Sequence, residues 1–160
     1  MKTATVSEIK RELKSKSDEE LLALCLHLSK FKKENKELLT YLLYESSDEE
    51  AFISGVKAEV EELFGEINTH SYYYIKKSVR KILRLIKKYI RYSKKKETEA
   101  QLLIHFSECL RSMNPPIQRD VALYNIYKRQ VEMIHKAIGT LHEDLQYDYQ
   151  QELQRLDEKD

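Results

Sequence analysis

Glycine and proline are almost absent from this chain of 160 residues, which contains 3 Gly and 2 Pro. Sheets joined by tight turns, and loops that cradle phosphate groups, depend on glycine for left-handed backbone or close approach. The three glycines, Gly55, Gly65 and Gly139, are isolated from one another, which excludes glycine-rich phosphate and dinucleotide loops. Because 41% of the residues are hydrophobic, the chain can still build a core without disulfides or metals. These features predict an all-α protein.

Capping patterns mark where the helices begin. A Ser or Thr followed three residues later by Glu is typical of a helix N-terminus, because each side chain accepts a hydrogen bond from the other residue's backbone N–H. The pattern occurs four times: Thr5–Glu8, Ser17–Glu20, Ser47–Glu50 and Thr140–Glu143.

Two breaks are expected in the second half of the chain. Gly139 suits a left-handed residue that closes one helix before the next begins. Asn114-Pro115-Pro116 is a harder boundary, since consecutive prolines donate no backbone hydrogen bonds, and Pro116 is expected in the first turn of the following helix.

These signals predict one all-α domain over residues 1–160 with about seven or eight helices in antiparallel hairpins. Their expected ranges are 4–15, 18–30, 34–45, 48–68, 71–92, 96–112, 116–138 and 141–156. A short α-solenoid of the HEAT or armadillo type is the first candidate architecture, and a helical bundle is the alternative. A weak self-similarity at an offset of 64 residues, with Leu21 on Leu85 and Leu38 on Leu102, indicates either duplication or merely shared helical periodicity.

A leucine-rich stretch follows the second cap: Ser17-Asp18-Glu19-Glu20-Leu21-Leu22-Ala23-Leu24, continuing to Lys33-Glu34-Asn35-Lys36-Glu37-Leu38-Leu39. It resembles the opening of a group of small, uncharacterised bacterial helical domains of unknown function. The resemblance covers roughly the first third of the chain. It implies a helical fold and nothing about activity.

The cysteine count and the hydropathy pattern predict a cytoplasmic protein. Cys25 and Cys109 lie in apolar helical patterns, where we expect small core residues, and two cysteines are too few for a disulfide framework. The N-terminal residues carry alternating charges rather than a signal-peptide core. The longest uncharged apolar run is nine residues, Leu21–Ser29, which is too short for a membrane-spanning helix.

One segment concentrates positive charge. No acidic residue lies between Glu66 and Glu97, whereas eleven Lys and Arg residues do. The remaining chain therefore holds 17 basic and 27 acidic residues, a formal charge of −10, although the whole chain carries only +1. The total thus conceals an uneven distribution of charge.

This segment is predicted to form an amphipathic helix. At about 100° per residue, an apolar stripe occupies one side and the basic residues fall within an arc of roughly 140° on the other. The stripe comprises Ile75, Val79, Ile82, Leu83, Ile86, Tyr89 and Ile90. The candidate binding residues are the basic row and two tyrosines before it: Lys77, Arg80, Lys81, Arg84, Lys87, Lys88, Arg91, Tyr73 and Tyr74.

The sequence is compatible with several functions of this row of basic residues. It is expected to bind an acidic surface of an unidentified protein partner, which makes the protein a non-enzymatic interaction module or scaffold. Alternatively it contacts phosphates of a nucleic acid, with the tyrosines stacking on bases. An anionic membrane surface is disfavoured, because the stripe has branched residues at core spacing and no Trp.

A purely structural role of the basic row is a further alternative. In that case its charges are solvated or pair with acidic residues of the preceding helix. Those acids are Asp48, Glu49, Glu50, Glu59, Glu61, Glu62 and Glu66. The acidic C-terminal segment could likewise fold back on the basic row, within one molecule or between two. The sequence leaves the oligomeric state open.

No motif predicts catalysis, a metal or a cofactor. A di-metal helical bundle needs two Glu-x-x-His pairs, and the chain has one, Glu132 with His135. His105 and Cys109 share a helix face but supply only two of the four ligands of a structural zinc site. We therefore predict that the protein is not an enzyme.

Overall fold

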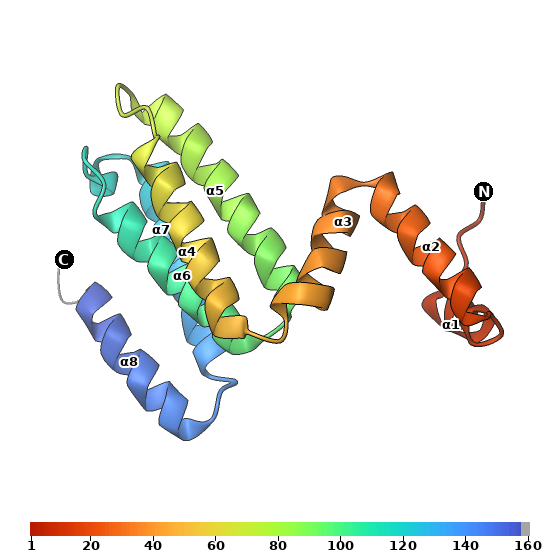
Figure 1. The fold of residues 1–160 in the computed structure, drawn as a ribbon. Helices are drawn as coiled ribbons and strands as arrows, with labels where there is room; N and C mark the ends of the chain where they lie inside the picture. Colours follow the sequence, from red (N-terminus) through yellow and green to blue (C-terminus); the bar gives the residue numbers. More distant parts are fainter. Residues whose placement is uncertain (158–160) are drawn as a thin grey trace. The chain divides into compact units, whose positions relative to one another are not determined.

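A computed structural model describes residues 1–157 of the chain, with side chains placed through residue 154. Within this range the secondary structure is helical and no strand occurs, which confirms the all-α prediction (Figure 1). The described residues form eight α-helices, together with a π-helical turn, η1 (Tyr41–Glu45), and a 3-10 turn, η2 (Ile117–Arg119). The α-helices are α1 (Val6–Lys14), α2 (Asp18–Phe31), α3 (Lys33–Thr40), α4 (Glu49–Gly65), α5 (Tyr72–Ser93), α6 (Lys96–Arg111), α7 (Val121–Ile138) and α8 (Glu143–Asp157). None of the described helices is long and apolar enough to cross a membrane.

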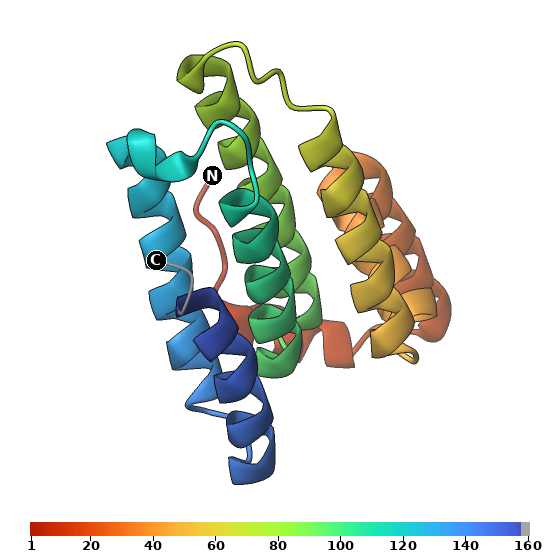
Figure 2. The same cartoon turned by 90° about the vertical axis from the view of Figure 1, so that its left-hand side faces the viewer.

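The helices form two compact units, Met1–Tyr44 and Glu45–Asp160. In the second unit α6 contacts α4, α5 and α7, and α7 also contacts α8. Consecutive helices of this unit run in opposite directions (Figure 1), and the turned view shows them side by side (Figure 2). This packing is consistent with a helical bundle, the alternative that the sequence indicated. Duplication at an offset of 64 residues stays a prediction.

The core of the second unit is built around α6. Because three helices cover it, α6 buries side chains on more than one side, and Phe106 contacts Phe64 of α4 with ring centroids 5.6 Å apart. The largest apolar side chains with almost no exposed surface come from five elements. They are Val60, Ile75, Val79, Ile86, Leu102, Leu103, Phe106, Leu110, Ile117, Leu123 and Ile134.

The first unit is organised differently. Its α2 contacts α3, and the Asn35 side-chain amide donates to the Leu28 carbonyl oxygen at 2.8 Å. Yet α1, α2 and α3 contain no buried residue. Cys25, expected in a core, is exposed, and Cys109 in α6 is only half-buried. Since apolar neighbours in sequence need not be covered in space, the expectation of two core cysteines was wrong for Cys25.

Two of the four predicted capping boxes form at the predicted residues. The backbone N–H of Thr5 donates to the Glu8 carboxylate at 2.7 Å, and that of Ser17 donates to the Glu20 carboxylate at 2.9 Å. Each hydroxyl in turn accepts from the glutamate N–H. These capping boxes fix the first residues of α1 and α2.

The third cap, at the start of α4, is shifted by one residue. Asp48 rather than Ser47 caps this helix, because its carboxylate accepts from the Ala51 N–H at 3.0 Å and Asp is as good a cap as Ser. The prediction was therefore wrong by one position.

The chain after α7 also departs from expectation. Thr140 donates its hydroxyl to the Ala137 carbonyl at 2.7 Å instead of capping α8, which begins at Glu143. Gly139 has φ −60°, because right-handed turns continue past the end of α7. Pro116 precedes η2 and lies outside α7, which Asp120 caps.

The left-handed residue lies elsewhere, at the end of α5. Lys94 is exposed and has φ 59°, a backbone conformation that costs an L-residue roughly 1–2 kcal/mol. Lys94→Gly is therefore expected to raise the free energy of unfolding by about 0.5–1 kcal/mol, allowing for the greater flexibility of unfolded glycine. Urea denaturation followed by circular dichroism measures this. Lys94→Ala keeps the left-handed strain, so a gain of the same size in that control would contradict the explanation.

Candidate basic interaction face

Within the second unit, helix α5 packs against the other helices through the predicted apolar stripe. Ile75, Val79, Ile82 and Ile86 are buried, with 2% or less of their surface exposed. Leu83, Tyr89 and Ile90 are half-buried, and Tyr92 adds a buried aromatic side chain that the predicted stripe did not include. The docked stripe turns the opposite side of α5 away from the core.

That opposite side carries the candidate cations. Five of the seven predicted basic residues are exposed, and Lys87 and Lys88 are half-buried. Lys88 lies with its Nζ 5.2 Å from the centroid of the Tyr89 ring. We call the five exposed residues the basic face: Lys77, Arg80, Lys81, Arg84 and Arg91.

The basic face is not neutralised from within the part of the chain that the structure describes. No ion pair or hydrogen bond joins its five side chains to a described residue. Pairing with the acids of the preceding helix, the structural alternative, involves other groups. Lys95 of the loop after α5 pairs with Glu49 at 2.9 Å, and the Tyr89 hydroxyl donates to Glu59 at 3.1 Å.

Both ends of α5 are held by carboxylates. At the start, Lys76 Nζ lies 2.9 Å from Asp120 Oδ2, and the other oxygen of Asp120 accepts from the Leu123 N–H at 3.0 Å. The hydrogen bond from Lys76 is the main cause that lowers the pKa of Asp120. Asp120 therefore joins α5 to the first turn of α7.

At the other end of α5, the Glu49 carboxylate binds the last residue of α5, the loop that follows it and the first turn of α6. It accepts from the Ser93 hydroxyl, from the Thr98 hydroxyl at 2.6 Å and from Lys95 at 2.9 Å. Sequence reasoning did not single out these two anchors as site residues. An Asp directly before a helix, as at position 120, was the available signal.

The tyrosines at the start of α5 divide into two groups. Tyr73 and Tyr74 are 68% and 48% exposed and contact each other edge to face, with centroids 5.3 Å apart. They precede Lys77 by four and three residues, which places them along the same side of the helix as the basic face. Tyr72 instead donates its hydroxyl to the Pro116 carbonyl at 2.8 Å.

The described side chains of the acidic C-terminal helix do not cover the basic face. Helix α8 contacts α7, and its Tyr149 hydroxyl donates to Glu97 of α6 at 3.1 Å. Burial and this carboxylate raise the pKa of Tyr149 to about 12. The described carboxylates of α8 form no ion pair with α5. The described part of this segment therefore does not fold onto the basic row of the same molecule, because α8 docks elsewhere through buried apolar side chains such as Tyr149 and Leu153, while residues 158–160 lie outside the described residues.

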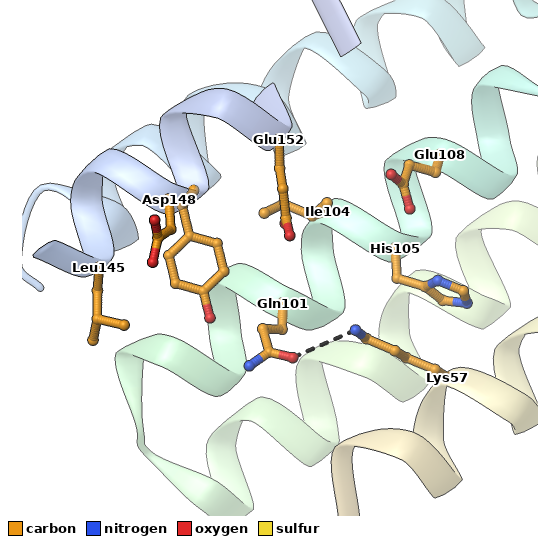
Figure 3. Close-up of a pocket in the computed structure, with 9 residues that line it drawn as sticks. Lys57, Gln101, Ile104, His105, Glu108, Leu145, Asp148 and Glu152 are labelled. Atoms are coloured by element: carbon orange, nitrogen blue, oxygen red, sulfur yellow. Dashed lines mark hydrogen bonds between the residues drawn. The ribbon is translucent and has the colours of Figure 1, made fainter. Parts of the chain in front are cut away.

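A separate cavity of about 380 Å³ lies between α4, α6 and α8 (Figure 3). Lys57 Nζ donates to the Gln101 side-chain oxygen at 3.4 Å across it. Its lining mixes both signs of charge, and no group of three His, Cys, Asp or Glu that could hold a metal occurs among the described residues. The lining comprises Lys57, Gln101, Ile104, His105, Glu108, Leu145, Asp148, Tyr149 and Glu152.

His105 and Cys109, which the sequence offered only as two of the four ligands of a zinc site, lie beside this cavity, and His105 lines it. Cys109 Sγ is 3.7 Å from His105 Nε2, and the same nitrogen is 3.3 Å from Glu61. Burial, with Glu61 and Glu108 nearby, raises the pKa of Cys109 to about 11. The thiol is therefore protonated at neutral pH, unlike an activated nucleophile.

Comparison with protein-family models, with curated proteins and with solved structures finds no match to this chain.

Proposed function

We propose that the protein is a non-enzymatic interaction module that binds an acidic protein surface through the basic face of α5. A single observation carries the proposal: five exposed cations without a described carboxylate partner lie along one helix that is anchored at both ends. Cations without a carboxylate partner among the described residues keep their electrostatic field available to a binding partner. Because the helix is already anchored, binding need not order it.

The dimensions of the basic face suit an extended acidic partner. Lys77 and Arg91 are 14 residues apart, which is about 21 Å along a helix. Arg80 and Arg84 lie between them at helical spacing, so the charges form a row rather than a cluster. Arginine also binds carboxylates in a planar, bidentate geometry. An acidic helix or extended acidic segment therefore matches this surface better than a single ion does.

Nucleic acid is the second candidate, and the exposed tyrosines favour it. Tyr73 and Tyr74 present aromatic surface at one end of the row, where bases of a single strand could stack while the cations contact phosphates. The same aromatic surface would also enlarge a protein interface, because Tyr combines a large contact area with a polar tip. The two candidate functions therefore use the same residues, and only binding measurements can distinguish them.

Fluorescence anisotropy with purified full-length protein tests both. The probes are a labelled Glu-rich helical peptide, single-stranded RNA and duplex DNA, each at low and physiological salt. The test variant combines Lys77→Glu, Arg80→Glu and Arg84→Glu. The matched control makes the same charge change on exposed residues of α7: Lys128→Glu, Arg129→Glu and Lys136→Glu.

We expect the peptide to bind, and the α5 variant to lose affinity more than about tenfold, since each reversed exposed contact costs about 1 kcal/mol. The α7 control should retain affinity. Binding confined to nucleic acid, falling steeply with salt, would instead support the second candidate. If no probe binds, or if the two variants lose affinity equally, the basic face is not the binding surface.

A further inference from the structure

Helix α2, in the first unit, carries apolar side chains on every side and buries none of its residues. Four of its leucines and its last residue are exposed, Phe31 most of all. A helix that is hydrophobic on all sides is normally buried, and contiguous exposed apolar surface marks an interaction site. The exposed residues are Leu22, Leu24, Leu26, Leu28 and Phe31.

One side of α2 combines this apolar surface with two opposite charges. Glu19, Leu22, Ala23, Leu26 and Lys30 fall within an arc of about 100° and are all exposed. We call these five residues the α2 stripe. Leu22 is 61% and Leu26 is 46% exposed. Apolar side chains thus occupy the middle of the stripe, with an acid at one end and a base at the other.

Other residues of α2 are directed to its neighbour. Cys25, Leu28 and Ser29 line an apolar groove of about 210 Å³ together with residues of α3. The α2 stripe contributes none of its residues to this groove. Contact with α3 therefore leaves the stripe uncovered.

The charges at the two ends of the stripe restrict what can cover it. Glu19 and Lys30 are separated by 11 residues, about 17 Å along the helix. Neither forms an ion pair with a described residue. A uniformly acidic or basic partner would attract one end and repel the other. A partner with the same two charges in reversed order matches both ends.

We propose that the α2 stripe pairs antiparallel with the α2 stripe of a second copy of this chain. A two-fold axis passing between Leu24 and Cys25 places Glu19 of each copy level with Lys30 of the other, and Ala23 level with Leu26, with Leu22 one residue further along the helix. Such an isologous contact uses one patch twice and forms two equivalent ion pairs. Parallel pairing would instead oppose Glu19 to Glu19 and Lys30 to Lys30. This inference is independent of the proposed function of α5.

Charge exchange tests the pairing in the full-length chain. Sedimentation velocity at micromolar concentration is expected to give twice the chain mass of 19.1 kDa. Glu19→Lys and Lys30→Glu should each weaken self-association about tenfold, because each opposes like charges at both ends. The double variant, Glu19→Lys with Lys30→Glu, should restore it.

Mixing the two single variants gives the sharpest result. Only a chain with two bases paired to a chain with two acids regains both ion pairs, so native mass spectrometry should show the mixed dimer in excess over either homodimer. Leu22→Glu with Leu26→Glu should yield a monomer whose circular dichroism is unchanged, since both positions are exposed. A monomeric wild-type chain, single variants that dimerise like wild type, or a mixture without preference for the mixed dimer would each overturn the proposal.

Discussion

Phe106→Ala is expected to lower the free energy of unfolding by about 3–5 kcal/mol. Phe106 has no exposed surface, lies in the central helix α6, and contacts the ring of Phe64. Truncation removes buried apolar area and leaves a cavity that helices packed on several sides cannot close. Urea denaturation followed by circular dichroism measures the loss.

The matched control is Tyr147→Ala, which removes an aromatic ring from an exposed position on α8. We expect this control to change stability by less than about 0.5 kcal/mol. A loss for Phe106→Ala as small as that of the control would mean that α6 is not the centre of the core.

Asp120→Ala is expected to lower the free energy of unfolding by about 2 kcal/mol. The substitution removes the cap of α7, which accounts for about 1 kcal/mol, and leaves Lys76 half-buried without its carboxylate. Asp120→Asn separates the two effects, because Asn can still accept from the Leu123 N–H but carries no charge. Thermal and urea unfolding of the three proteins at neutral pH should therefore place Asp120→Asn between wild type and Asp120→Ala.

The stability that Asp120 supplies should also depend on pH in a defined direction. Its pKa is lowered from the ordinary value of 3.8, mainly by the hydrogen bond from Lys76, so the folded protein favours the charged carboxylate. This contribution is complete above the unfolded-state pKa and is lost as the pH falls toward the folded-state pKa. The difference in stability between wild type and Asp120→Asn should therefore shrink on acidification below about pH 4. A difference that grows on acidification would contradict this assignment.

The amphipathic character of α5 was predictable because it depends on local periodicity. The spacing of Ile75, Val79, Ile82 and Ile86 fixes which side of a helix docks, whatever it docks against. The exposure of the cations follows from the same periodicity. The helical class followed from the scarcity of Gly and Pro for a similar reason, since both are properties of short segments.

Features that depend on distant partners were not predictable. The sequence does not reveal that Asp120 meets Lys76 across 44 residues, or that α8 docks beside α6 and α7 rather than on α5. The cap predicted at Ser47 was wrong because the adjacent Asp48, an equally good capping residue, accepts from the Ala51 N–H. The cap predicted at Thr140 was wrong because its hydroxyl donates to the Ala137 carbonyl of the preceding turn. The exposure of Cys25 could not be foreseen, because hydrophobicity indicates that a helix needs cover without indicating what supplies it.

The concentration of positive charge on one helix makes net charge a poor guide to how this molecule behaves in solution. At neutral pH a formal charge of +1 gives almost no mutual repulsion, yet a negatively charged surface meets a row of five cations on α5. The molecule should therefore adsorb to cation-exchange matrices in a preferred orientation. At low ionic strength, acidic helices of one molecule attract the basic helix of another, so added salt should increase rather than decrease colloidal stability.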